Sequence, residues 1–285
     1  MVLLPNAFEP QTSGCEIMTL SLNEIKRYSR QLVLPDLGAR EQNRLKNAKV
    51  AVTGAGGLGC PVSTYLALSG VGKIDLIDMD RADITNLNRQ FLYTPEDTGK
   101  IKAEVAAEKL NAINPEIEVT GINEMITYDN AFDLLKGYDA VVDGTDNFPV
   151  RYAVNDACMV NEIPLFHGAV LMYEGRVTSI IPKETACFRC AFPEAPPAGS
   201  VPTCREAGVI GAMTGLVGSI QSMEAIRHLA GLPISFKNRL LVINIDIGSF
   251  DVITLRRRLD CTACGDKFIP KPVAEVCETR SGSDE

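Results

Sequence analysis

Three glycines stand at the spacing of a nucleotide-binding loop. Gly54, Gly56 and Gly59 form G-x-G-x-x-G directly after the apolar run 49–53, KVAVT. Such glycines let the backbone come close to a phosphate or ribose, and a helix that begins behind the loop favours negative charge. Asp78 ends the next apolar run, where a carboxylate can bind ribose hydroxyls. The pattern indicates a nucleotide, with NAD as the default and a glycine turn without a ligand as the alternative.

The side chains that follow fit a triphosphate better than a dinucleotide. Arg89 stands in NLNRQ and Lys102 in TGKIKA. Two cations can neutralise the charge that develops as an α-phosphate is attacked, and an NAD site has no need of both. Asp146, in GTDN after the apolar run 138–142, lies where the end of a strand would place a carboxylate for Mg²⁺. Plainer interpretations are a surface ion pair for Arg89, a solvated helix position for Lys102 and a helix N-cap for Asp146.

Four of the nine cysteines form two C-x₂-C pairs. Cys187 and Cys190 belong to CFRC, and Cys261 and Cys264 belong to CTAC. Two such pairs are the usual source of a tetrahedral zinc site. Because residues 191–260 separate the pairs, a shared site would join two remote segments. Four unrelated thiols or a redox pair are the alternatives.

The other thiols and the two histidines stand in different settings. Cys60 and Cys158 have apolar neighbours, which predicts small core residues. Cys204 lies in a polar run that follows the proline-rich connection 191–202. His167 is expected in the core and His228 on a helix surface.

Alternating apolar runs and helical patterns would position these residues. The expected strands are 49–53, 73–78, 116–121, 138–142, 164–171, 175–181, 239–245 and 251–256. The expected helices are 23–32 with Asn23 as N-cap, 39–48, 58–70, 100–113, 149–161, and 213–229 with Met223 on its buried face. The alternation predicts an α/β fold: a Rossmann-like, mostly parallel sheet flanked by helices, with additional strands. The two cysteine pairs add a Cys₄ zinc site to this expectation.

Composition narrows the class of protein. The 285 residues are 46% apolar and 22% charged, which is ordinary for a globular chain, and the net charge of −8 argues against a nucleic-acid groove. Neither a membrane span nor a signal peptide is evident, so we expect a cytoplasmic protein with reduced thiols. We expect a disordered tail at 1–20, a single domain at 21–270 and a flexible tail at 271–285, with Met18 as an alternative start.

The chain resembles the MoeB/ThiF/HesA family in GAGGLGCPVSTYLALSGVGKIDLIDMD, NLNRQFLY, TGKIKA, DGTDN and TCREAGV, between Tyr28 and Gly265. These proteins are adenylyltransferases related to ubiquitin-activating enzymes. The resemblance implies ATP- and Mg²⁺-dependent adenylation of the C-terminal glycine of a ubiquitin-like sulfur carrier of the MoaD/ThiS type, ending in Gly-Gly. It also implies bound Zn²⁺, and sulfur transfer toward molybdopterin, thiamin or thiolated tRNA.

Matching positions imply roles for individual residues. Gly57 and Asp78 would contact adenosine, and Asp146 would bind Mg²⁺. The implied cofactor-binding set is Gly57, Asp78, Asp80, Thr85, Asn86, Leu87, Asn88, Arg89, Lys102, Asp146 and Asn147. The implied catalytic set is Arg30, Arg89, Lys102, Asp146 and Cys204. In the family, an R-Y-x-R-Q motif supplies an arginine to the partner subunit of a homodimer, and Arg30 holds that position here.

The resemblance leaves two interpretations of Cys204. Its thiolate, favoured by neighbouring Arg205, would take the activated carrier or sulfur in a covalent link. Alternatively it is a bystander, since MoeB-like members adenylate without a cysteine nucleophile. Sulfur would come from a separate cysteine desulfurase or rhodanese. The competing functions are an NAD-dependent oxidoreductase and a non-catalytic paralogue that only binds a ubiquitin-like partner.

Overall fold

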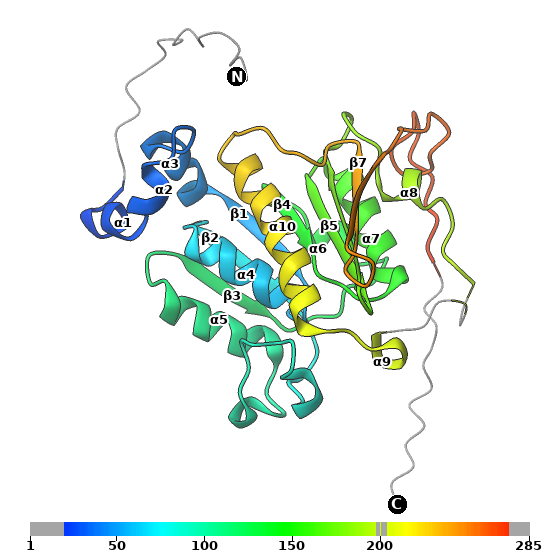
Figure 1. The fold of residues 1–285 in the computed structure, drawn as a ribbon. Helices are drawn as coiled ribbons and strands as arrows, with labels where there is room; N and C mark the ends of the chain where they lie inside the picture. Colours follow the sequence, from blue (N-terminus) through cyan, green and yellow to red (C-terminus); the bar gives the residue numbers. More distant parts are fainter. Residues whose placement is uncertain (1–19, 198–199, 201–203, 274–285) are drawn as a thin grey trace, which may run out of the picture.

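The computed structural model describes residues 20–197, 200 and 204–273, which form a sheet covered by helices on both faces (Figure 1). Eight strands lie in the order β3-β2-β1-β4-β5-β6-β7-β8. The first five in this order are parallel, and the pairs from β5 to β8 are antiparallel. The expectation of a mostly parallel α/β sheet with additional strands is therefore confirmed.

The strands agree closely with the apolar runs. Their bounds are β1 Lys49–Thr53, β2 Lys73–Ile77, β3 Glu118–Ile122, β4 Ala140–Asp143, β5 Leu165–Leu171, β6 Glu174–Ile180, β7 Arg239–Asn244 and β8 Ser249–Thr254. The helices are α1 Leu22–Arg27, α2 Ser29–Leu32, α3 Ala39–Asn47, α4 Gly59–Leu68, α5 Lys102–Ile113, α6 Ala131–Leu134, α7 Phe148–Val160, α8 Phe188–Ala191, α9 Cys204–Ala207 and α10 Gly211–Leu229. Short 3₁₀ turns occupy Ile84–Asn86 and Pro95–Asp97.

Side-chain alternation along the central strands divides the core into two layers. Val50 and Val52 pack with residues of α4, α5 and α10 on one face of the sheet. Ala51, between them, packs with residues of α6 and α7 on the other face. A central strand buried on both faces explains why β1 is apolar at successive positions.

Three segments that carry candidate site residues meet at one edge of this sheet. β1 ends at Thr53 and runs into the glycine loop, β2 ends just before Asp78, and β4 ends at Asp143 just before GTDN. Because these strands are parallel, their carboxyl ends lie at the same edge, where ligands of such sheets bind.

Two details of the helices differ from expectation. The pattern at 23–32 forms two short helices, and the N-cap is Ser21, whose hydroxyl accepts from the Glu24 amide while the Glu24 carboxylate accepts from the Ser21 amide. This reciprocal capping box outcompetes Asn23 as a helix start. Met223 is 56% exposed, because the face of α10 that it shares points away from the sheet.

The ends of the described chain are held by specific contacts. Leu20 is buried, and the Lys271 amide donates to the Tyr128 hydroxyl at 3.2 Å. The rest of both expected tails, 1–19 and 274–285, lies outside the described residues. None of the described helices has the length and apolarity needed to cross a membrane.

Candidate functional site

The glycine loop is closed by backbone contacts that exclude side chains. A Cβ at Gly59 would lie 1.9 Å from the Gly54 carbonyl oxygen. Gly54 has a φ of +93°, and its amide donates to the Ile77 carbonyl at 2.8 Å. A Cβ at Gly54 would also come within 3.0 Å of the Gly144 carbonyl, so the loop touches the segment that carries Asp146. The tight turn leaves its backbone open for close approach by a ligand.

Asp78 joins the glycine loop to the segment after β2. One carboxylate oxygen accepts from the Ala55 amide at 2.7 Å, and the other accepts from the Asp80 amide at 2.7 Å. Burial raises the pKa of this carboxyl above its ordinary value, while nearby Lys102 and the two amide donors oppose that rise. Each carboxylate oxygen retains a second lone pair, which is what a ribose hydroxyl would require.

Lys102 is a buried cation beside this loop, which excludes the solvated position considered above. It begins α5, is 5% exposed, and its ammonium lies 3.0 Å from a carboxylate oxygen of Asp80. The Tyr93 hydroxyl lies 2.7 Å from the Ala55 carbonyl and 3.3 Å from the Lys102 carbonyl, so it links the two segments. A desolvated ammonium attracts anions more strongly than one in water.

Arg89 also lies next to the glycine loop. Its guanidinium donates to the Thr85 carbonyl at 3.1 Å and to the Asn88 side chain at 3.0 Å. A Cβ at Gly57 would lie 3.6 Å from Arg89 Cδ. Arg89 forms no ion pair with any residue in the described part of the chain, so the surface ion pair considered above is absent there.

The residues between Asp83 and Arg89 form a short turn. The Thr85 amide and hydroxyl both donate to the Asp83 carboxylate, at 2.8 and 2.6 Å, and the Asn86 side chain lies 3.5 Å from the Thr85 hydroxyl. This turn sets the direction of the arginine that follows it.

Asp146 projects into solvent just beyond β4. It is exposed, and its carboxylate makes no hydrogen bond or ion pair to the residues that the structure describes. The N-cap of α7 is Asn147, whose side chain accepts from the Val150 amide at 3.0 Å. The N-cap interpretation of Asp146 is therefore wrong, and its carboxylate is available to a cation.

Asp143 and His167 form a buried pair behind this segment. Parallel pairing of β4 with β5 sets Asp143 opposite His167, and one carboxylate oxygen lies 2.7 Å from His167 Nδ1. Burial lowers the pKa of His167, so the ring is neutral and Nδ1–H donates. Burial also opposes ionisation of Asp143, but hydrogen bonds from His167 and Thr145 hold the pKa of that carboxyl below its usual value. His167 is the core residue that its sequence setting predicts.

Arg30 lies far from the residues above. It is an exposed residue of α2, and its neighbour Gln31 donates to the Ser69 carbonyl at the C-terminal end of α4. The glycine loop precedes the opposite end of α4, and Figure 1 shows α2 and the segment between β2 and α5 on opposite sides of the molecule. Arg30 is therefore not part of the group of residues around the glycine loop.

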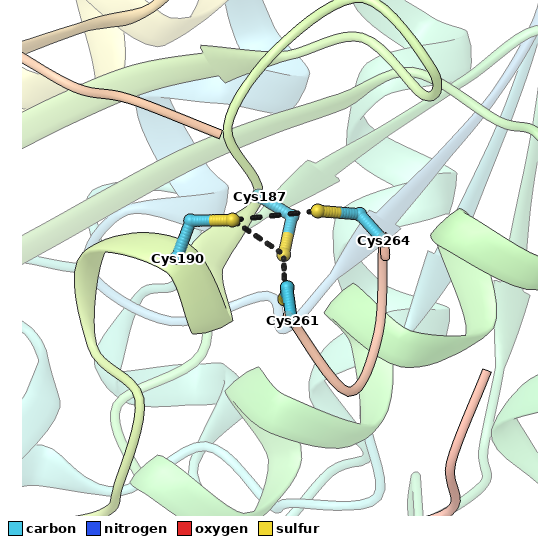
Figure 2. Close-up of side chains that lie close together, drawn as sticks. All are labelled: Cys187, Cys190, Cys261 and Cys264. Atoms are coloured by element: carbon cyan, nitrogen blue, oxygen red, sulfur yellow. Dashed lines mark hydrogen bonds between the residues drawn. The ribbon is translucent and has the colours of Figure 1, made fainter. Parts of the chain in front are cut away.

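The four cysteines of the two C-x₂-C pairs do meet (Figure 2). Cys187 Sγ lies 3.5 Å from Cys261 Sγ, Cys190 Sγ lies 3.3 Å from Cys264 Sγ, and all four sulfurs lie within 4.8 Å of one another. Tetrahedral zinc with Zn–S bonds of about 2.3 Å places its sulfurs roughly 3.8 Å apart. The donor set and its spacing thus fit a four-coordinate zinc ion, and four unrelated thiols are excluded.

A buried ion pair fixes the CFRC segment to α7. The Arg189 guanidinium donates to both oxygens of Asp156, each at 2.7 Å, and also to the Lys271 carbonyl. Both charged side chains are almost fully buried, and Arg189 stacks 4.6 Å from the centre of the Tyr152 ring. The arginine between the two cysteines therefore joins α7, α8 and the segment after the second cysteine pair.

The remaining thiols fall into two groups. Cys60 and Cys158 are fully buried as predicted, and burial raises the pKa of Cys60 to about 12. Cys204 begins α9, but its side chain and that of Arg205 lie outside what the structure describes. The backbone after α9 is anchored to the turn between β5 and β6, because the Met172 amide donates to the Gly208 carbonyl at 3.1 Å.

Sequence reasoning assigned no role to Asp143, Tyr93 or Gln90. Gln90 follows Arg89, is 4% exposed, and its side-chain oxygen has no hydrogen-bond partner among the described residues. Its side-chain nitrogen would lie 3.6 Å from a Cβ at Gly56. Polar residues inside the motifs themselves were the available signal for all three.

Comparison with known proteins places this geometry in a family. The model of the ThiF family matches residues 28–263, so the chain belongs to that family. It is 43% identical over 255 residues to a sulfur carrier protein adenylyltransferase of Thermus thermophilus, covering 88% of this chain and 94% of the relative. It is 40% identical over 251 residues to the SAMP-activating enzyme E1 of Haloferax volcanii, covering 87% and 93%.

Other relatives are longer. An adenylyltransferase and sulfurtransferase MOCS3 of Culex quinquefasciatus is 44% identical over 251 residues, which are 88% of this chain but 57% of that protein. Among solved structures, E. coli MccB with ATP superposes with a TM-score of 0.75 at 26% identity, covering 84% of this chain and 74% of that chain.

Proposed function

We propose that this ThiF-family protein uses ATP and Mg²⁺ to adenylate the C-terminal carboxylate of a ubiquitin-like sulfur carrier that ends in Gly-Gly. One observation carries the proposal: the glycine loop, buried Lys102, Arg89 and the exposed carboxylate of Asp146 lie at one edge of the sheet. The relative named as a sulfur carrier protein adenylyltransferase supports the same activity, and the relative named as an adenylyltransferase and sulfurtransferase agrees with it.

The reaction joins the carrier carboxylate to the α-phosphorus of ATP and releases pyrophosphate. Gly57 and the loop receive the nucleotide, and Asp78 binds the ribose. Lys102 and Arg89, aided by Asn86, stabilise the negative charge that builds on the phosphates as the bond to pyrophosphate breaks. Asp80 pairs with Lys102 in the free protein and releases that ammonium when phosphates arrive.

Mg²⁺ would be held by Asp146, where it supplies positive charge between the phosphates. The donor is suitable because an exposed carboxylate without another partner is the ligand type that Mg²⁺ prefers. The Asn147 side chain caps α7, so it orients the segment. Thr85, Leu87 and Asn88 belong to the turn that precedes Arg89.

A homodimer would complete the site. Arg30 stands away from its own glycine loop, so its family role requires a second copy that presents Arg30 across the interface. Zinc would be held by Cys187, Cys190, Cys261 and Cys264, and with four protein ligands it would have no open position for catalysis. Sulfur would reach the acyl-adenylate from a separate donor, for molybdopterin, thiamin or tRNA thiolation.

The test is ATP–pyrophosphate exchange with a purified Gly-Gly carrier. Wild-type protein should exchange only with Mg²⁺ and with a carrier whose terminal glycines are intact. Asp146→Ala should lower the exchange rate by about 100-fold or more, because the divalent ion loses its protein ligand. Asp133→Ala, which removes an exposed carboxylate on α6, is the matched control and should exchange at the wild-type rate. Equal rates in Asp146→Ala and the control would contradict the assigned role.

A further inference from the structure

The loop that carries Asp146 is fixed through Thr145, the residue just before it. One Asp143 carboxylate oxygen accepts from the Thr145 amide at 2.9 Å and from the Thr145 hydroxyl at 2.6 Å. The Thr145 carbonyl accepts from the Arg151 guanidinium at 2.9 Å. Thr145 is thus held at its amide, hydroxyl and carbonyl, and little freedom remains for the direction of Asp146.

Asp143 can organise this loop only while its own carboxylate is held still. It is 1% exposed, so water does not solvate it, and its second oxygen is bound by His167 Nδ1–H. Removing that donor would leave a buried carboxylate oxygen unpaired. The carboxylate would then turn toward another donor, and its bonds to Thr145 would change.

The far side of the His167 ring rests on the cysteine segment. Phe188, between Cys187 and Cys190, meets the His167 ring edge-to-face with centroids 4.8 Å apart. The Phe188 amide donates to the Asn155 side chain at 2.9 Å, which fixes the phenylalanine to α7. His167 is therefore clamped between a rigid aromatic ring and the Asp143 carboxylate.

We propose that His167 is a positioning residue, which acts through Asp143 and Thr145 to aim Asp146 at Mg²⁺. This inference rests on the proposed function, because it assumes that Asp146 is the Mg²⁺ ligand. Groups one layer behind a metal ligand commonly set its affinity, and their loss costs about 10- to 100-fold. His167 stands one layer further back, so its effect should lie at the low end of that range.

Two substitutions separate positioning from packing. His167→Phe keeps an aromatic ring against Phe188 but removes the donor to Asp143. His167→Asn discards the ring but presents an amide N–H close to the place of Nδ1. A positioning role predicts that His167→Phe is the more damaging change for Mg²⁺, and a purely structural role predicts the reverse order. His228→Phe is the matched control, because His228, on α10, is half-buried against Phe166 of β5.

The experiment has a binding arm and an activity arm. The binding arm titrates Mn²⁺, as a spectroscopic substitute for Mg²⁺, into protein saturated with a non-hydrolysable ATP analogue, and counts free Mn²⁺ by electron paramagnetic resonance. The activity arm measures the Mg²⁺ concentration that gives half-maximal pyrophosphate exchange. His167→Phe should raise both concentrations by about 10-fold. His167→Asn should recover most of that loss, and His228→Phe should match wild type.

Several outcomes would overturn the proposal. Wild-type Mn²⁺ affinity in His167→Phe would do so, as would weaker binding in His167→Asn than in His167→Phe. If His167→Phe does not fold, Thr145→Val tests the Asp143–Thr145 bond on which the proposal depends, and wild-type Mn²⁺ affinity in that variant would overturn the proposal. If wild-type protein binds Mn²⁺ with the analogue but shows no exchange, the proposed function fails while the binding arm still decides the role of His167.

Discussion

Replacing Gly59 by alanine tests how tightly the glycine loop is closed. The new Cβ would lie 1.9 Å from the Gly54 carbonyl oxygen and 2.8 Å from its carbon. Real Cβ contacts essentially never fall below 3.0 Å, so the two segments must separate by 3.0 − 1.9 = 1.1 Å. Gly54 cannot move freely, because its amide is bonded to Ile77 and its other side faces Gly144.

The cost follows from the rigidity of both neighbours. Overpacking of this kind costs up to about 3 kcal/mol, and a Cβ forced against a backbone carbonyl should reach that value. For a chain of this size, that loss lowers the melting temperature by roughly 6–12 °C. A displacement of about 1 Å at a catalytic site can cost on the order of 100-fold in rate, so pyrophosphate exchange should fall to a similar degree.

The assay pairs thermal unfolding with exchange and uses Gly215→Ala as the control. Gly215 lies inside α10, and a Cβ there meets nothing within 4 Å. This control should stabilise the protein by up to about 1 kcal/mol through helix propensity alone. If Gly59→Ala melts within about 2 °C of wild type, the loop between Gly54 and Gly59 can accept a Cβ without the predicted cost, and the reasoning is refuted.

Four further outcomes are expected. Protein purified without chelator should hold one zinc per chain by metal analysis, and Cys187→Ser should lose it and melt at a lower temperature; zinc-free wild type would contradict this. Mixing Arg30→Ala with Asp146→Ala chains should restore roughly a quarter of wild-type activity if subunits mix randomly, act independently and share Arg30 across the interface, and none if Arg30 does not act across it. Cys204→Ala should keep pyrophosphate exchange, and only loss of sulfur transfer in a complete system would establish a covalent role. The free energy of unfolding should fall by up to about 1.4 kcal/mol per pH unit below pH 6.5, because buried His167 has a lowered pKa and takes up a proton only on unfolding. If the free energy of unfolding of His167→Asn depends on pH as steeply as that of wild type, another group is responsible.

Sequence patterns predicted the central strands well because a buried parallel strand must be apolar on both faces. The runs at 49–53 and 138–142 became β1 and β4 with little change in bounds. The pairing of the cysteines was also predictable, since C-x₂-C spacing reflects the geometry of a metal ion. Ser21 as a helix start depended on a reciprocal bond to Glu24, which composition alone did not favour over Asn23.

The site was harder to predict where partners come from different elements. Lys102 reads as an ordinary helical lysine, and only the packing of its segment against the glycine loop shows that it is buried. Asp143 and His167 become neighbours through the register of β4 on β5, which no local pattern specifies. The side chain of Cys204 lies outside the described residues, so its two interpretations stay open.

The two cysteine pairs of the cluster are synthesised at different times. Cys187 and Cys190 are synthesised before α10, β7 and β8, whereas Cys261 and Cys264 come after all three. On the ribosome, therefore, a chain that has been synthesised through α8 has only two of the four cysteines of the cluster. Two thiols bind zinc far less well than four, so zinc, if this cluster holds it as proposed, would be captured only after β7 and β8 have been synthesised. When zinc is scarce, we would expect chains in which the first cysteine pair is not joined to the second and the segment after β8 is not held in place.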